Sequence, residues 1–242
     1  TFISNAAIEP EITQLADFLL SMGAKIDGVG TNNLEIQGVD SLSSSQVATI
    51  PDRIETGTLL VAGCVTKSKI TITNADKKII ESVIVSLEKC GCKILIKDKK
   101  ITIDCTDIEL KPVSISTSVY PGFPTDMQAQ WSALMSIVKG KSTVTDTIYF
   151  DRFNHVPELN RLGAKISVEN NTATINGVSK LKGAKVMSTD LRASACLVIA
   201  GLAAEGSTEV LRVYHLDRGY QRIETKLKNL GADIQRVESK EY

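Results

Sequence analysis

The sequence of 242 residues lacks several features that mark particular classes of protein. Its longest apolar run, residues 193–204, covers only about two-thirds of a membrane-spanning helix and is interrupted by Ser194 and Gly201. Neither sign of charge is in excess, because Lys+Arg and Asp+Glu both total 28, and no basic stripe or secretory signal pattern is present. We therefore expect no membrane association, no nucleic-acid partner and a cytoplasmic location.

Histidines and paired cysteine motifs are also scarce. The two histidines, His155 and His215, are far apart in sequence, and none of the five cysteines follows the C-x-x-C spacing of zinc or redox motifs. Most of the cysteines lie inside apolar runs. We therefore expect buried free thiols in a reducing compartment, no metal site and no cofactor.

One pattern, present four times, dominates the rest of the sequence. In each copy an amphipathic helix ends at a glycine and an alternating strand follows, and successive glycines lie 68, 72 and 68 residues apart: Gly23, Gly91, Gly163 and Gly231. Glycine can adopt the left-handed conformation that follows the last turn of a helix. Hairpins are predicted after two of the glycines, pairing residues 93–97 with 101–105 and 164–168 with 172–176.

A second helix, apolar on all sides, alternates with the first, as is typical of helices buried between layers. It is predicted over residues 57–65, 129–138 and 193–204, and leads into β-branched strands at 70–73, 143–149 and 208–214. The unit is thus β-α-β-α-β-β, which predicts an α/β fold (α+β by some schemes). Units begin near residues 45, 111 and 182, the third lacks its final strand, and residues 1–44 look like the last half of an earlier unit.

Aspartates and arginines recur at the ends of the units. An aspartate opens each apolar helix, where N-capping is the expected role: Asp52, Asp126 and Asp190. Helix N-termini of this kind also suit an anionic ligand. Arg152 and Arg218 occupy matching strand ends, where arginine can bind phosphate or carboxylate through two parallel hydrogen bonds. The alternative for each arginine is a surface ion pair with the adjacent Asp151 or Asp217.

Five segments combine these features with specific residues: 51–58 (PDRIETGT), 123–130 (FPTDMQAQ), 152–159 (RFNHVPEL), 189–195 (TDLRASA) and 215–220 (HLDRGY). Together they resemble the UDP-N-acetylglucosamine 1-carboxyvinyltransferase family of enolpyruvyl transferases over essentially the whole chain. The resemblance implies six units forming two inside-out α/β barrel domains that face each other across a cleft.

The resemblance also implies a division of the chain. Residues 1–50 would be the C-terminal part of the first domain, and residues 51–242 the second domain without its N-terminal strand. The N-terminal portion of the same enzyme would then be a partner of this chain. Because that portion carries the family's N-terminal Lys and mobile-loop Cys, the chain alone is expected to be inactive.

The implied reaction transfers the enolpyruvyl group of phosphoenolpyruvate to the 3-hydroxyl of UDP-N-acetylglucosamine and releases phosphate, through a tetrahedral ketal. It opens peptidoglycan synthesis and so serves cell-wall growth, cell shape and cell division. The resemblance places Asp126 beside the sugar hydroxyl as ligand and candidate base, and Asp190 near the reacting carbon, without deciding which is the base. It implies substrate-binding roles for Ile148, Arg152, Leu191, Arg192 and Arg218.

Two alternatives remain open from the sequence. A shikimate 3-phosphate enolpyruvyl transferase would have the same fold and a related site. The chain could also be a non-catalytic fragment, or a binding half that depends on its N-terminal portion.

Overall fold

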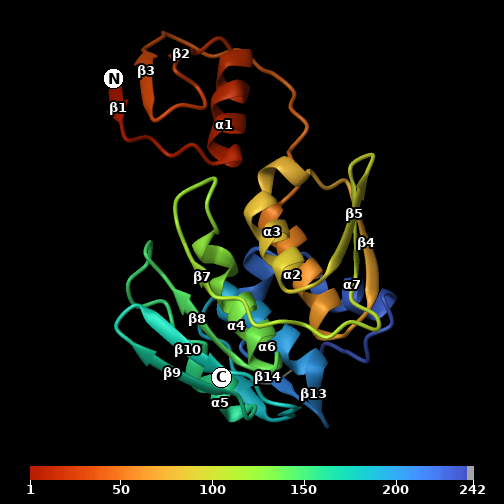
Figure 1. Ribbon diagram of the computed structural model, residues 1–242. Helices are drawn as coiled ribbons and strands as arrows, with labels where there is room; N and C mark the ends of the chain where they lie inside the picture. The colour runs from red at the N-terminus through yellow and green to blue at the C-terminus, as the bar shows by residue number, and fades with distance from the viewer. Residues whose placement is uncertain (239–242) are drawn as a thin grey trace.

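The computed structural model describes residues 1–238, which form a small N-terminal unit and a larger body (Figure 1). The N-terminal unit, at the top of the figure, packs helix α1 (Pro10–Ser21) beside a sheet of order β1-β3-β2, formed by Phe2–Ser4, Asn33–Gln37 and Lys25–Asp27. Residues 38–52 contain no helix or strand and lead into the larger body. No helix within residues 1–238 combines the length and apolar character that a membrane span requires.

Three apolar helices form the centre of the larger body: α2 (Arg53–Val65), α4 (Gln128–Ser136) and α6 (Leu191–Ala203). They pack against one another, and every residue of α4 is buried. Sheets and the remaining helices surround them (Figure 1), so the helices are inside and the strands outside. The predicted apolar helices, and their burial between layers, are confirmed.

The strands of the larger body form four sheets around these helices. An antiparallel sheet of order β4-β6-β5 contains Lys69–Thr73, Lys100–Asp104 and Lys93–Lys97. A mixed sheet of order β7-β8-β10-β9 contains Ile115–Ser116, Lys141–Thr145, Thr172–Asn176 and Lys165–Glu169. Two parallel pairs join β12 (Lys185–Met187) to β14 (Glu209–Leu211) and β11 (Leu181–Lys182) to β13 (Ala204–Glu205). Because β7-α4-β8 and β12-α6-β14 each join parallel strands through a helix, they are the crossover units that the repeat predicts.

The second helix of each unit is amphipathic and lies outside the central three: α3 (Glu81–Lys89), α5 (Val156–Arg161) and α7 (Ile223–Asn229). Short 3₁₀ turns precede α3, α4 and α7 as η1 (Lys77–Ile79), η2 (Thr125–Met127) and η3 (Val213–Arg218). The four marker glycines follow α1, α3, α5 and α7, and their φ angles lie between 90° and 100°: Gly23, Gly91, Gly163 and Gly231. The predicted left-handed helix ends are thus confirmed.

The repeat is less regular than the sequence predicts at four places. Residues 45–51, where the first unit should open with a strand, form none. The strand predicted over 143–149 ends at Thr145, because the Asp146 carboxylate accepts the backbone N–H groups of Ile148 and Tyr149 and turns the chain. The strand predicted over 208–214 is paired only over 209–211, and the left-handed conformation of Arg212 (φ +58°) ends it. Residues 232–238 do not form the strand expected after α7.

Candidate active site

Asp126, in η2, lies at the centre of the candidate site. Its Oδ1 accepts a hydrogen bond from Arg152 Nη1 at 2.7 Å, and its Oδ2 accepts one from Arg192 Nη2 at 2.8 Å. Burial opposes its ionisation, but the two guanidiniums hold the pKa of Asp126 below its usual value. The prediction that Asp126 caps α4 is wrong, because its carboxylate binds two arginines and no side chain caps that helix.

The capping role is confirmed for the two equivalent aspartates. Each Oδ1 accepts hydrogen bonds from the backbone N–H groups two and three residues further on, at 2.7 and 3.0 Å for Asp52 and at 2.8 and 2.9 Å for Asp190. The cap holds Asp190 at the start of α6, directly before Leu191 and Arg192. Two of the three recurring aspartates are therefore caps, and the middle one joins side chains from different elements.

A buried carboxylate that the sequence analysis did not single out supports Arg152. Thr125 Oγ1 accepts a hydrogen bond from Arg152 Nη1 at 3.1 Å and donates one to Asp146 Oδ2 at 2.6 Å. Asp146 is fully buried and also accepts the Thr117 hydroxyl at 2.7 Å. Although burial opposes its ionisation, these hydrogen bonds hold the pKa of Asp146 below its usual value. The signal available in the sequence was an aspartate within the predicted strand 143–149, among threonines and apolar residues.

Arg152 does not form the ion pair with Asp151 that the sequence offers as an alternative. Its guanidinium turns instead to Asp126, and its carbonyl accepts a hydrogen bond from the Gln128 side chain. The matching alternative for Arg218 is also wrong, because the carboxylate of Asp217 binds Arg236 at 2.5 and 2.8 Å.

A buried polar network contacts Arg192 through the guanidinium nitrogen that does not bind Asp126. Arg192 Nη1 lies 3.3 Å from the Tyr220 hydroxyl, which is also 2.9 Å from Thr58 Oγ1 and 3.2 Å from Gln130 Nε2. Thr58, Gln130 and Tyr220 are at most 1% exposed, so the network lies inside the core. Through Thr58, Gln130 and Arg192 it connects α2, α4 and α6. Burial raises the pKa of Tyr220, so its hydroxyl stays protonated while it accepts hydrogen bonds from Arg192 and Gln130. No sequence pattern indicates this network.

His155 lies in the same segment as Arg152 and is 2% exposed. Its Nε2 is buried without a hydrogen-bond partner among the described residues. Burial lowers the pKa of His155 to about 4, an effect that Asp190 opposes and Arg152 reinforces. A neutral imidazole thus lies close to the start of α6.

The other predicted site residues lie around this cluster. Leu191 packs against η3, because a Cβ added at Gly219 would come within 2.9 Å of its side chain. Arg218, next to Gly219, is exposed and forms no ion pair within residues 1–238. Ile148 is 44% exposed, on the turn whose backbone Asp146 holds. The structure thus joins Asp126, Arg152 and Arg192 directly and places Asp190, Leu191 and Arg218 at the same end of α6.

The charges of this cluster suit an anion. The guanidiniums of Arg152, Arg192 and Arg218 lie around one end of the buried helices. Among the described residues, Asp126 is the single carboxylate that pairs with Arg152 and Arg192. Arg218 is free to contact a ligand, and the bidentate geometry of guanidinium matches carboxylate and phosphate. The capped start of α6 adds a helix N-terminus of the same preference.

Comparison with known proteins places these features in context. The model of the family described as EPSP synthase (3-phosphoshikimate 1-carboxyvinyltransferase) matches residues 1–227. The chain is 56% identical over 242 residues to the UDP-N-acetylglucosamine 1-carboxyvinyltransferase of Prosthecochloris aestuarii, covering all of this chain and 57% of that protein. The protein of the same name from Shewanella halifaxensis is 54% identical over 239 residues, which are 99% of this chain and 57% of the relative.

Among solved structures, the enolpyruvyl transferase NikO from Streptomyces tendae is similar with a TM-score of 0.86 and 27% identity. The similarity covers 97% of this chain and 56% of NikO. The chain therefore spans a little over half the length of the relatives it matches.

Proposed function

This chain belongs to the EPSP synthase family, and from that membership we propose that it takes part in transferring the enolpyruvyl group of phosphoenolpyruvate to the 3-hydroxyl of UDP-N-acetylglucosamine, with release of phosphate. The observation that carries the proposal is the carboxylate of Asp126 shared by Arg152 and Arg192, beside the capped start of α6. The names of the relatives at 54–56% identity favour the nucleotide sugar as the acceptor.

The proposed roles divide between anion binding and proton transfer. Arg192 and Arg218 would hold the phosphoenolpyruvate anion, and Arg152 would keep Asp126 in place. Leu191 would line the pocket at the reacting carbon, and the backbone of Ile148 would contact the nucleotide sugar.

The two aspartates differ in their capacity to accept a proton. Asp126 is held ionised between two guanidiniums, so its carboxylate is oriented and unprotonated and can accept a proton. Asp190 uses Oδ1 as the helix cap, whereas its Oδ2 has only a 3.5 Å contact, with Thr189 Oγ1. We propose that Asp126 binds the sugar hydroxyl and accepts its proton during addition. The methylene carbon would receive a proton from the mobile-loop Cys of the N-terminal portion during addition. Asp190 would remove a proton from that carbon during elimination, as the C–O bond to phosphate breaks.

We assign residues 1–50 to the end of a first domain and residues 51–242 to a second domain. In support, only Ala16 of α1 is buried, while Leu15 is 53% exposed on the apolar stripe of the helix. The remaining length of the relatives would supply the rest of the first domain and the second wall of the site. As an early step of peptidoglycan synthesis, the reaction would take place in the cytoplasm and support cell shape and division.

A substrate comparison tests the proposed function. The chain, joined to the N-terminal portion of its protein, is assayed for phosphate release from phosphoenolpyruvate with UDP-N-acetylglucosamine or with shikimate 3-phosphate. We expect phosphate release when UDP-N-acetylglucosamine is the acceptor and none when shikimate 3-phosphate is the acceptor. Release only with shikimate 3-phosphate would overturn the assignment of the acceptor, and release with neither would overturn the proposed activity.

Measurements on the 242-residue chain alone distinguish a binding half from an active enzyme. Calorimetry would detect binding of the nucleotide sugar to this chain, and the phosphate assay would detect turnover. Without the second wall of the site, we expect this chain to bind the nucleotide sugar more weakly than the chain joined to its N-terminal portion does. We expect it to release no phosphate.

A further inference from the structure

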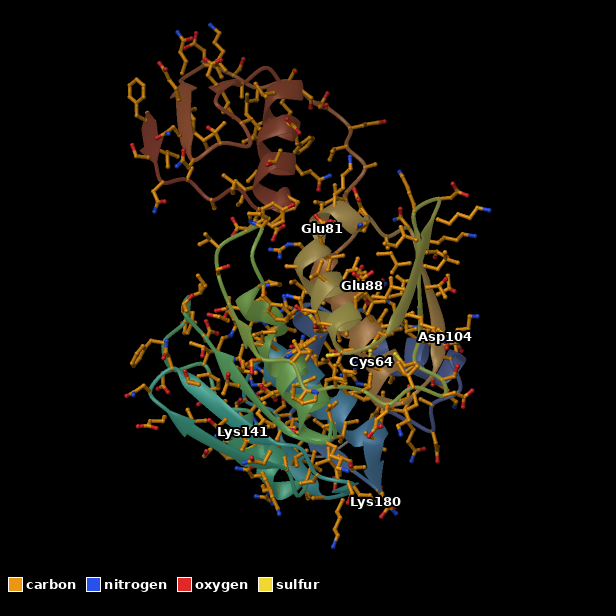
Figure 2. The ribbon with its side chains drawn as sticks, viewed as in Figure 1. Cys64, Glu81, Glu88, Asp104, Lys141 and Lys180 are labelled. Carbon is orange, nitrogen blue, oxygen red and sulfur yellow. The ribbon has the colours of Figure 1, made fainter. Side chains whose placement is uncertain are left out.

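Three buried cysteines meet outside the candidate active site. Cys64 Sγ lies 3.4 Å from the sulfurs of both Cys92 and Cys105, and all three sulfurs lie within 4.8 Å of one another. Their exposed fractions are 0%, 6% and 0%. Figure 2 labels Cys64 in the interior, beside the β4-β6-β5 sheet. The cysteines come from the last turn of α2, the residue before β5 and the residue after β6.

The backbone holds these three positions firmly. A Cβ added at Gly63 would come within 3.0 Å of Ile70 on β4, so the end of α2 packs closely onto the sheet. The Cys92 N–H donates to the Leu87 carbonyl and the Cys105 N–H to the Ser68 carbonyl, both at 3.1 Å. The sulfurs therefore converge because the elements are anchored, and not because flexible side chains happen to meet.

The simplest interpretation is three small apolar side chains packed in a core, which is a common role for free cysteine. The spacing allows more than packing. An ion with metal–sulfur bonds of about 2.3 Å holds its sulfur ligands roughly 3.5–4 Å apart, close to the separations observed here. Three soft donors at this spacing form a preorganised site for a single thiophilic ion.

The surroundings determine which charge the ion should have. The three cysteines belong to one continuous apolar core, where an uncompensated charge is costly. A divalent ion bound by three thiolates leaves a net charge of −1. A trivalent ion leaves none, and trivalent ions that prefer sulfur in a three-coordinate, pyramidal geometry include arsenic.

We propose that Cys64, Cys92 and Cys105 form a binding site for trivalent arsenic, taken up as arsenous acid. Three As–O bonds break and three As–S bonds form, and each thiol proton leaves with a hydroxide as water. Arsenic stays trivalent throughout, no oxidant or reductant is needed, and the product is neutral. The reaction starts from three protonated thiols, so the three S–H protons account for the three waters released.

The site is separate from the proposed reaction. Cys64 lies six residues along α2 from Thr58, the member of the Arg192 network on that helix, which is about 9 Å at the rise of an α-helix. Cys92 is the only one of the three with any exposure, so arsenous acid would enter beside the start of β5. Because the bound ion would join α2 to both ends of the β5–β6 hairpin, it should raise the unfolding temperature.

The test uses the reduced 242-residue chain with sodium arsenite. We expect one arsenic per chain by native mass spectrometry, with loss of three hydrogens, and three sulfur neighbours in the arsenic K-edge absorption spectrum. Zinc ions at the same concentration should bind at least about tenfold more weakly because of the residual charge. One or two sulfur neighbours, more than one arsenic per chain, no uptake, or tighter binding of zinc would each overturn the proposal.

Variants identify the ligands. Cys64→Ser, Cys92→Ser and Cys105→Ser should each raise the arsenite Kd by on the order of 100-fold, because the third attachment to a preorganised site is intramolecular. Cys196→Ser is the matched control, since Cys196 is a fully buried thiol on α6 outside the cluster. Unchanged affinity in Cys92→Ser, the variant at the most exposed of the three positions, would refute the site. The absorption spectrum of the unmodified chain decides the matter if the other two variants do not fold.

Discussion

Arg192 Nη2 lies 2.8 Å from Asp126 Oδ2, although the two residues are 66 positions apart in the chain. The bond joins the start of α6 to the turn before α4, and Arg152 completes the cluster from beyond β8. One carboxylate thus holds two guanidiniums at the end of the buried helices.

Asp126→Asn should remove catalysis while leaving the fold intact. The amide cannot accept a proton from the sugar hydroxyl, so we expect kcat to fall by about 10²–10⁴-fold in the chain joined to its N-terminal portion. Phosphate release measures the effect. Asp52→Asn is the matched control, because asparagine also caps helices and Asp52 has no partner in the site. Near-normal release by Asp126→Asn would contradict the proposed role.

Tyr220→Phe should weaken phosphoenolpyruvate binding more than it slows turnover. The change removes the hydroxyl that holds Arg192 Nη1 and leaves Gln130 and Thr58 with one partner fewer. We expect a several-fold rise in KM for phosphoenolpyruvate and a loss of about 1–3 kcal/mol of stability.

Tyr214→Phe is the control for Tyr220→Phe, since Tyr214 is 54% exposed and its hydroxyl bonds only to Arg212 among the described residues. Steady-state kinetics and thermal unfolding are compared for the two variants. A fall in stability with KM unchanged would show that Tyr220 supports the core and does not position Arg192.

Stability should fall as the pH drops from about 6.5 to 4, because of His155. Its pKa is about 4 in the folded protein, below the value of 6.5 expected when the chain unfolds. The unfolded state therefore binds more protons in this interval, and the free energy of unfolding decreases by up to about 3 kcal/mol. Urea unfolding at several pH values measures the slope. If His155→Gln keeps the full slope of the parent chain, the histidine is not its source.

Gly163→Ala should destabilise the protein by about 1 kcal/mol. Space is available for the methyl group, but the residue has φ +90°, which is unfavourable for any side chain. Gly38→Ala is the matched control, because Gly38 also has open space and its φ is not positive. Equal unfolding temperatures for the two variants would contradict the role of the left-handed helix end.

Elements defined by neighbours in sequence were predicted well. The two hairpins form at the predicted strands, within one or two residues at each end, and the apolar helices lie where their composition indicates. The strand ends were predicted less well, since Asp146 and Arg212 end their strands by local contacts and conformation that hydropathy does not reveal. Buried polar groups escaped prediction for a different reason. Thr58 on α2, Gln130 on α4 and Tyr220 after η3 are ordinary residues in sequence and meet only when these segments pack together.

The sequence by itself determined the repeated unit, the helix ends at glycine and the capping by Asp52 and Asp190, because each depends on residues within a few positions. Only the tertiary structure decided that Asp126, in the same pattern, binds Arg152 and Arg192 and caps nothing. It also decided that three cysteines, unremarkable by spacing, place their sulfurs within reach of one ion. The physical reason is the same in both cases. The hydrophobic period of the repeat and the capping of a helix are local properties of the chain. The partner of a carboxylate or a thiol depends instead on which helices and strands pack side by side in the core.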